Sequence, residues 1–162
     1  MKIAVVGAGA MGSLFGGRLA EAGQEVWLIE VWKAHVDAIR AGGLAFSERG
    51  TTRQISVKAT TEPAEAGAVD LVIVFCKHNN TREAIRGAAP LIVPETLVLT
   101  LQNGIGNVDI IRSVVPADQV VMGLALLYAY RSQTPSIQPV VYSQAIQEIN
   151  SGQVKKVTIV AN

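Results

Sequence analysis

Apolar residues in the first part of the chain alternate between short continuous runs and helical spacing. Ile3 to Val6 is a continuous, mostly β-branched run that ends in glycine, the pattern of a strand buried on both faces of a parallel sheet. From Ala10 to Ala22 apolar residues recur at three- and four-residue intervals, and Gly23 closes the predicted helix. The chain therefore opens with a strand, a tight turn and a helix.

The same alternation continues along the chain. A second strand and helix are predicted at 25–30 and 33–41, two short strands at 44–46 and 53–58, and the most apolar strand at 71–75. A helix at 81–89, a strand at 96–101, a helix at 107–115 and a strand at 119–127 follow. Strands that alternate with helices imply an α/β fold with a doubly wound, mostly parallel sheet of Rossmann type.

The turn between the first strand and the first helix carries a glycine motif. Its six residues fit G-x-G-x-x-G in the strand–turn–helix context that gives this pattern its meaning. The first glycine allows the sharp turn, the second lets the backbone approach a pyrophosphate, and the third lets the helix pack closely on the strand. Since helix N-termini attract anions, we expect this turn to hold the pyrophosphate of a nicotinamide dinucleotide. The residues expected to bind it are Gly7, Ala8, Gly9, Ala10, Met11 and Gly12.

The end of the second strand bears on which dinucleotide is favoured. Glu30 lies 18 residues after Gly12, near the interval of about 20 that is usual for the ribose-binding acid. A carboxylate there can accept from both ribose hydroxyls of NAD and repels the 2′-phosphate of NADP. NAD is favoured, although Lys33 and Arg40 could still reach a phosphate.

Composition narrows the classes of function. The 162 residues are 49% apolar, enough for one core, and the net charge of +1 comes without the basic stripe that nucleic-acid binding needs. The N-terminal apolar run is too short for a signal peptide, and no run approaches the roughly 18 residues of a membrane span. The single cysteine, Cys76, cannot pair within the chain. We expect a cytoplasmic protein with a small-molecule partner, no nucleic acid and no membrane, and an exposed sheet edge would favour a homo-oligomer.

Three segments carry a family resemblance. They are Lys2 to Gly12, Val74 to Lys77 at the end of the most apolar strand, and Leu101 to Asn107, which contains a Gln-Asn-Gly-x-Gly-Asn block. Together they resemble the ketopantoate reductases (2-dehydropantoate 2-reductases) over residues 1–131. The resemblance implies an oxidoreductase that uses NAD(P)H to reduce 2-dehydropantoate, a 2-keto acid, to pantoate on the route to pantothenate.

The resemblance also implies roles for individual residues. Lys77 would contact the cofactor, Asn103 would hold both cofactor and substrate near the nicotinamide, and Ala129 would make a backbone contact to the cofactor. Lys77 and Asn103 each follow the C-terminal end of a strand, where open α/β sheets bind ligands. The alternatives are a solvated lysine for Lys77 and an Asn-Gly turn for Asn103.

The chain departs from the family in two ways. Val31 stands where many members have an arginine for the 2′-phosphate of NADP, which again favours NAD. The family's helical C-terminal domain, which supplies a lysine as proton donor, is absent from this sequence, so no catalytic residue is assigned and turnover by this chain alone is not expected. His78 is interpreted as a loop histidine without a chemical role, and His35 as a solvated one.

The composition changes after residue 131. Residues 132–139 predict a polar, proline-bearing linker, and residues 140–162 an atypical tail with a short strand, a helix and a closing strand. Residues 142–157 resemble the extracytoplasmic segment of FtsH-type membrane metalloproteases, without their membrane helix, ATPase motif or zinc site. The tail is a foreign fragment fused to a truncated reductase or a substitute for the missing domain, and the first explanation is favoured.

Three functions remain open from the sequence. The main hypothesis is the cofactor-binding portion of a ketopantoate reductase. The second is a non-catalytic dinucleotide-binding or interaction module that uses the tail to recruit a partner. The third is another β-hydroxyacid dehydrogenase, against which the Gln-Asn-Gly block argues.

Overall fold

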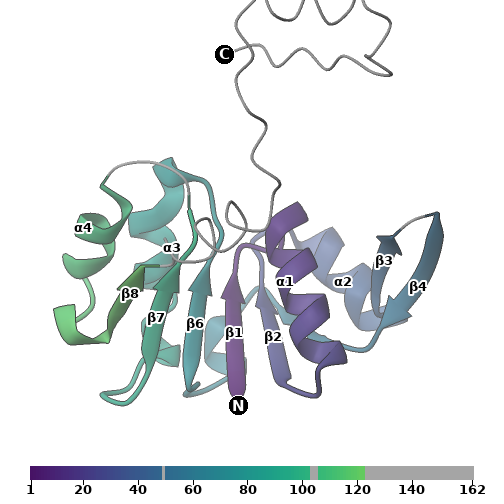
Figure 1. Cartoon of the computed structure of the whole chain (residues 1–162), viewed down its shortest axis with the longest axis horizontal. Helices are drawn as coiled ribbons and strands as arrows, with labels where there is room; N and C mark the ends of the chain where they lie inside the picture. The colour runs from purple at the N-terminus through teal and green to yellow at the C-terminus, as the bar shows by residue number, and fades with distance from the viewer. Residues whose placement is uncertain (49, 103–105, 123–162) are drawn as a thin grey trace, which may run out of the picture. The chain divides into compact units, whose positions relative to one another are not determined.

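A six-stranded parallel sheet forms the centre of the described part of the chain (Figure 1). The computed structural model describes residues 1–48, 50–102 and 106–122. The strand order is β5-β2-β1-β6-β7-β8, and each neighbouring pair is parallel. This order confirms the predicted doubly wound sheet of Rossmann type. The strands are β1 (Lys2–Val6), β2 (Glu25–Ile29), β5 (Lys58–Thr60), β6 (Leu71–Val74), β7 (Leu97–Thr100) and β8 (Val120–Met122).

Helices follow most of these strands. The α-helices in the described part of the chain are α1 (Ala10–Glu21), α2 (Lys33–Gly42), α3 (Thr81–Gly87) and α4 (Asn107–Arg112). Short 3₁₀ turns lie at η1 (Pro63–Glu65), η2 (His78–Asn80), η3 (Ala89–Leu91) and η4 (Ala117–Gln119). The helices predicted at 81–89 and 107–115 thus end earlier than expected. The far end of the strand predicted at 119–127 lies outside the described residues, as do the predicted boundary at 131, the linker and the tail.

Strand β1 is buried on both faces, as its continuous apolar run predicts. Ile3 and Val5 pack in one hydrophobic cluster with Val36 and Ile39 of α2. Ala4 and Val6 pack in a second cluster with residues of α3 and α4, among them Ile85 and Ile111. Alternate residues of a strand point to opposite faces, so the sheet separates two cores.

The buried face of α1 consists of glycine. Met11 and Leu14, which belong to the predicted apolar pattern, are 52% and 41% exposed. A Cβ added at Gly16 would lie 2.5 Å from Cδ2 of Leu28 on β2. The helix therefore lies closer to the sheet than large side chains would allow, and its buried residues are Gly12, Gly16 and Gly17.

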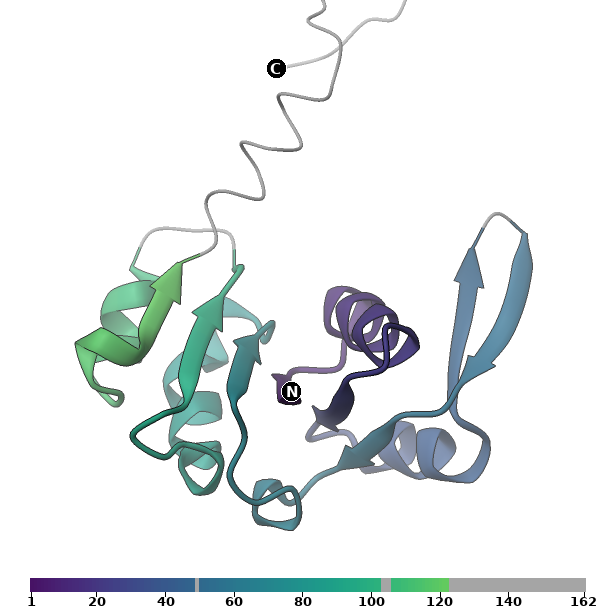
Figure 2. The same ribbon diagram turned by 60° about the horizontal axis from the view of Figure 1, so that its bottom comes forward.

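The sequence predicted one strand over residues 53–58, but the structure divides this segment between two strands. β3 (Leu44–Glu48) and β4 (Thr51–Ile55) form an antiparallel hairpin outside the main sheet, on the side of α1 and α2 (Figure 2). Lys58 instead begins β5, which pairs with β2 at the sheet edge. The split follows from the strand pairing, because Ile55 pairs with Leu44 in the hairpin, whereas residues 58–60 pair with β2.

Candidate cofactor site

The glycine turn lies between the carboxyl ends of β1, β2 and β6. The N–H of Gly7 donates to the carbonyl oxygen of Ile29 at 2.9 Å. Gly7 has φ +96°, and a Cβ there would lie 2.7 Å from the backbone nitrogen of Cys76. A Cβ at Gly12 would lie 1.9 Å from the carbonyl oxygen of Gly7. The backbone thus folds back on itself so tightly that positions 7 and 12 accept only glycine without a shift.

The turn ends at an open helix N-terminus. Gly9 is the N-cap residue of α1, and nothing lies within 4 Å of a Cβ added there. No side chain caps this end, and the first turn of the helix contains no acidic residue. Because the first amides of a helix lack partners within the helix, they are available to an anion. The N-terminus of α1, including Ala10 and Met11, therefore fits a phosphate group.

Glu30 joins the end of β2 to the glycine turn. Its Oε2 accepts a hydrogen bond from the N–H of Ala8 at 2.8 Å. Its Oε1 accepts from the N–H of Val31 at 2.8 Å and from the N–H of Trp32 at 3.2 Å. Three backbone donors thus fix the orientation of the carboxylate. The sequence predicted the position of Glu30, but not that its carboxylate would hold the turn.

His35 and Trp32 also reach this region, and the interpretation of His35 as a solvated residue is wrong. Nε2 of His35 lies 3.2 Å from the carbonyl oxygen of Ala8, and its ring stacks on that of Trp32 with centroids 5.8 Å apart. One turn of α2 brings His35 back over Trp32, the residue at its N-cap. The signal available in the sequence was a tryptophan two positions after Glu30.

The end of β6 lies at the same edge of the sheet. Lys77 lies three residues after the end of this strand, and it is exposed. Nearby, Nε2 of Gln102 donates to the carbonyl oxygen of Cys76 at 2.6 Å and to Oγ1 of Thr81 at 2.9 Å. Oγ1 of Thr100 donates to Oε1 of Gln102 at 3.1 Å. Gln102 thus links the ends of β6 and β7 and leads into the segment that contains Asn103.

Asn107, the last residue of the Gln-Asn-Gly block, is buried and contacts His78. It begins α4, and its side chain is buried. Its Oδ1 lies 2.7 Å from Nδ1 of His78, and since an amide oxygen only accepts, Nδ1 carries the proton. Asn103 and Ala129, to which the resemblance gives cofactor contacts, lie outside the described residues.

Cys76 sits beside the glycine turn as a half-buried thiol. Burial raises the pKa of this thiol, and the opposing hydrogen bonds with Thr81 and Gln102 are weaker. The folded state therefore holds the thiol proton more tightly than the unfolded chain does. The corresponding stability is present below the ordinary thiol pKa and is lost as pH rises through the higher folded value.

We accordingly expect slow alkylation of Cys76 in the native protein. Near pH 8.5, about the ordinary thiol pKa, iodoacetamide should modify Cys76 more slowly in the native chain than in the chain in urea. Mass spectrometry of timed samples measures both rates. Equal rates in the native and unfolded chains would contradict this account of the thiol.

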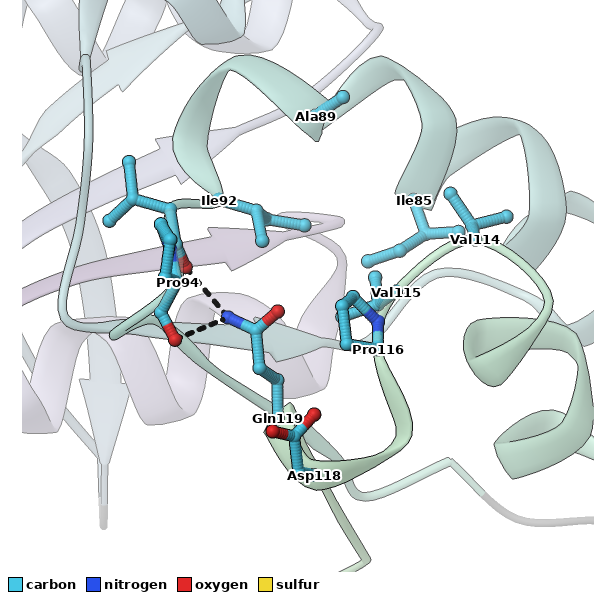
Figure 3. Close-up of a pocket in the computed structure, with 10 residues that line it drawn as sticks. Ile85, Ala89, Ile92, Pro94, Val114, Val115, Pro116, Asp118 and Gln119 are labelled. Atoms are coloured by element: carbon cyan, nitrogen blue, oxygen red, sulfur yellow. Dashed lines mark hydrogen bonds between the residues drawn. The ribbon is translucent and has the colours of Figure 1, made fainter.

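A pocket of about 410 Å³ lies elsewhere (Figure 3). It is lined mainly by apolar residues around η3 and η4, such as Ile92 and Pro116. Nε2 of Gln119 donates to the carbonyl oxygens of Val93 at 2.6 Å and Pro94 at 3.1 Å on one side of it. Since η3 and η4 precede β7 and β8, this pocket lies toward the amino ends of these strands, whereas the glycine turn follows a carboxyl end.

Two features are missing from the described ranges, residues 1–48, 50–102 and 106–122. No helix there has the length and apolar character needed to cross a bilayer. Nor do His, Cys, Asp and Glu side chains there form a group of three or more that could hold a metal ion.

The glycine turn, Glu30 and the end of β6 belong to a chain with clear relatives. The family model "Ketopantoate reductase PanE/ApbA" matches residues 3–156. The 2-dehydropantoate 2-reductase of Lactococcus lactis is 39% identical over 125 residues, which are 76% of this chain and 40% of the relative. This chain therefore spans about two fifths of that protein's length.

Solved structures agree with the sequence relatives. A PanE/ApbA family ketopantoate reductase from Ralstonia eutropha is 38% identical with a TM-score of 0.68, over 75% of this chain and 40% of that one. D-mandelate dehydrogenase, in a ternary structure with NADH and anilino(oxo)acetate, is 39% identical with a TM-score of 0.72, over 76% and 40%. Fold, motif and sequence identity therefore agree, and the chain belongs to the ketopantoate reductase PanE/ApbA family.

Proposed function

We propose that this chain binds NADH as the cofactor-binding portion of an enzyme that reduces 2-dehydropantoate to pantoate. The observation that carries the proposal is the Glu30 carboxylate, held by the N–H of Ala8 next to the uncapped N-terminus of α1. A ribose acceptor and a phosphate site are thus adjacent. The 2-dehydropantoate 2-reductases among the relatives support the keto-acid substrate.

Each part of the site has a proposed task. The amides of residues 9–11 hold the pyrophosphate, and Glu30 accepts from the ribose hydroxyls. Lys77 contributes a positive charge near the cofactor, Asn103 orients cofactor and substrate, and Ala129 makes a backbone contact. When bound, the nicotinamide supplies the hydride that reduces the keto carbon. We assign no proton donor to the described residues.

Three features support NADH over NADPH. The Val31 side chain is 92% exposed and offers no charge to a 2′-phosphate. Nζ of Lys33 lies 2.7 Å from Oδ2 of Asp37, which already balances its charge. Nε of Arg40 donates to the carbonyl oxygen of Ala59 at 2.7 Å. Both cations that could have reached a phosphate are therefore engaged.

Changing Val31 to arginine is expected to raise the affinity for NADPH. A guanidinium beside the ribose can bind the 2′-phosphate in two-point geometry, so we expect a gain of about tenfold, which corresponds to roughly 1.4 kcal/mol. Fluorescence titration with NADPH and NADH measures it. Val31→Gln, which is similar in length but uncharged, serves as the control and should gain little. An equal gain in both variants would rule out a charge effect.

The reaction itself is tested by separate assays. Because no proton donor is assigned, the main proposal and a dinucleotide-binding module both predict that this chain binds NADH without turnover. Reduction of 2-dehydropantoate by this chain alone, followed by NADH absorbance, would contradict the account of the missing proton donor. A second candidate is the dehydrogenation of a D-2-hydroxy acid, because D-mandelate dehydrogenase with bound NADH is as similar as the reductases. Turnover with D-mandelate alone would favour that candidate. Failure to bind either dinucleotide would refute the proposal.

We propose a cytoplasmic location, in keeping with a small-molecule substrate. For residues 142–157, the resemblance to FtsH-type proteases stays a prediction that no comparison supports. The match of the family model through residue 156 favours reading much of this segment as part of the reductase family instead.

A further inference from the structure

The loop after β2 exposes an aromatic side chain beside the proposed ribose site. Trp32 is 67% exposed, and its backbone N–H donates to the same Glu30 carboxylate that holds the glycine turn. Exposed tryptophans are uncommon in a protein with a well-filled core, because the indole ring favours burial. This position therefore suggests that a ligand covers the ring.

The ring of His35 stacks against one face of the Trp32 ring. The two rings are nearly parallel, with 22° between their planes and 5.8 Å between centroids. Nε2 of His35 lies 3.2 Å from the carbonyl oxygen of Ala8, whose N–H is bound by Glu30. The glycine turn, the ribose acid and the aromatic pair thus meet at one residue, Ala8. Movement of Trp32 relative to the phosphate site is restricted by these contacts.

We propose that Trp32 stacks on the adenine base of the dinucleotide, with His35 as the residue that positions its ring. The inference rests on the proposed function, because the ribose recognised by Glu30 carries this base. Aromatic rings stack on nucleobases with about 1–3 kcal/mol per base. Nζ of Lys33 lies 2.7 Å from Oδ2 of Asp37 and pairs with it. The Trp32 ring is therefore the main group in this loop that can bind the base. Trp32 thus contributes affinity to the adenosine half of the cofactor and none to the nicotinamide half.

Calorimetric titration with two half-ligands tests this assignment. ADP-ribose contains the adenine, whereas reduced nicotinamide mononucleotide lacks it. We expect Trp32→Ala to weaken ADP-ribose and NADH binding by about 5- to 150-fold, the range that the stacking free energy gives, and to leave the mononucleotide unchanged. Trp32→Phe keeps an aromatic face and should retain most of the affinity. Because Trp32 is exposed, both variants should melt near the temperature of the parent chain.

A second measurement reports on the ring directly. The chain has two tryptophans. The other one, Trp27, lies on β2, and the centroid of its ring is 5.0 Å from Nζ of Lys58. In the Trp27→Phe variant the emission comes from Trp32 alone, and ADP-ribose should quench it. His35→Ala should reduce this quenching, since the ring then loses its support.

The outcomes separate the two proposals. If the parent chain binds neither NADH nor ADP-ribose, the proposed function fails, and this inference fails with it. If the parent binds both and Trp32→Ala binds ADP-ribose equally well, the proposed function stands and the adenine contact is refuted. Equal loss of ADP-ribose and mononucleotide affinity would also refute it, because that result indicates a general disturbance of the site.

Discussion

Replacing Gly12 with alanine is expected to destabilise the chain by about 3 kcal/mol, near the upper end of what overpacking costs. The new Cβ would lie 1.9 Å from the carbonyl oxygen of Gly7, and backbone cannot yield as a flexible side chain does. The modest gain in helix propensity from alanine, about 1 kcal/mol, is too small to compensate. Urea denaturation followed by circular dichroism measures the change.

The matched control is Gly87→Ala at the end of α3. A Cβ there meets nothing within 4 Å, and the residue is helical. Alanine should therefore leave the free energy of unfolding unchanged or raise it slightly. If Gly12→Ala unfolds at the same urea concentration as Gly87→Ala, α1 does not pack against the glycine turn as closely as described.

Replacing Glu30 with glutamine is expected to lower the affinity for NADH by about 10- to 100-fold and stability by about 1–3 kcal/mol. The two carboxylate oxygens accept from the N–H of Ala8 and from the N–H groups of Val31 and Trp32. Glutamine has one oxygen, so its NH₂ group must face at least one backbone donor. The glycine turn would then lose a hydrogen bond that holds it to the end of β2, and the ribose would lose a charged acceptor.

NADH titration and urea denaturation of this variant separate the two effects. Glu95→Gln is the control, because Glu95 is an exposed carboxylate in the segment before β7, away from the glycine turn. It should behave as the parent chain does. We also expect NADPH to lose less affinity than NADH in Glu30→Gln, since the repulsion of the 2′-phosphate falls. An equal loss for both cofactors would argue against the role of Glu30 in selecting between them.

Local patterns predicted the elements that depend on neighbouring residues. The apolar run at 3–6 gave a doubly buried strand, and the glycine spacing marked the turn before α1. Of the buried face of α1 only Gly12 was predicted, from the glycine motif. Gly16 and Gly17 were not, because apolar periodicity counts Met11 and Leu14 but gives no weight to glycine. The split between β4 and β5 also escaped prediction, since it depends on the pairing of Lys58 with Trp27 across the sheet.

In the candidate site, too, the sequence predicted some features and missed those that depend on tertiary contacts. Glu30 and Lys77 could be placed from strand ends and motif spacing, and both lie at carboxyl ends of strands in the structure. The contacts of His35 with Ala8 and of Gln102 with Cys76 join residues 27 and 26 positions apart. Such contacts depend on tertiary structure, and single residue types carry no signal for them. The roles of these residues in binding stay predictions.

The position of β1 in the sheet also bears on the order of folding. It pairs with β2 on one side and with β6 on the other, where Ile3 lies opposite Leu71. During synthesis β1 emerges well before β6, and this second partner is complete only when residue 74 has left the ribosome. Parallel pairings between distant segments close slowly. We therefore expect nascent chains that end before β6 to stay open to proteases and chaperones, although every residue of the glycine turn is already present.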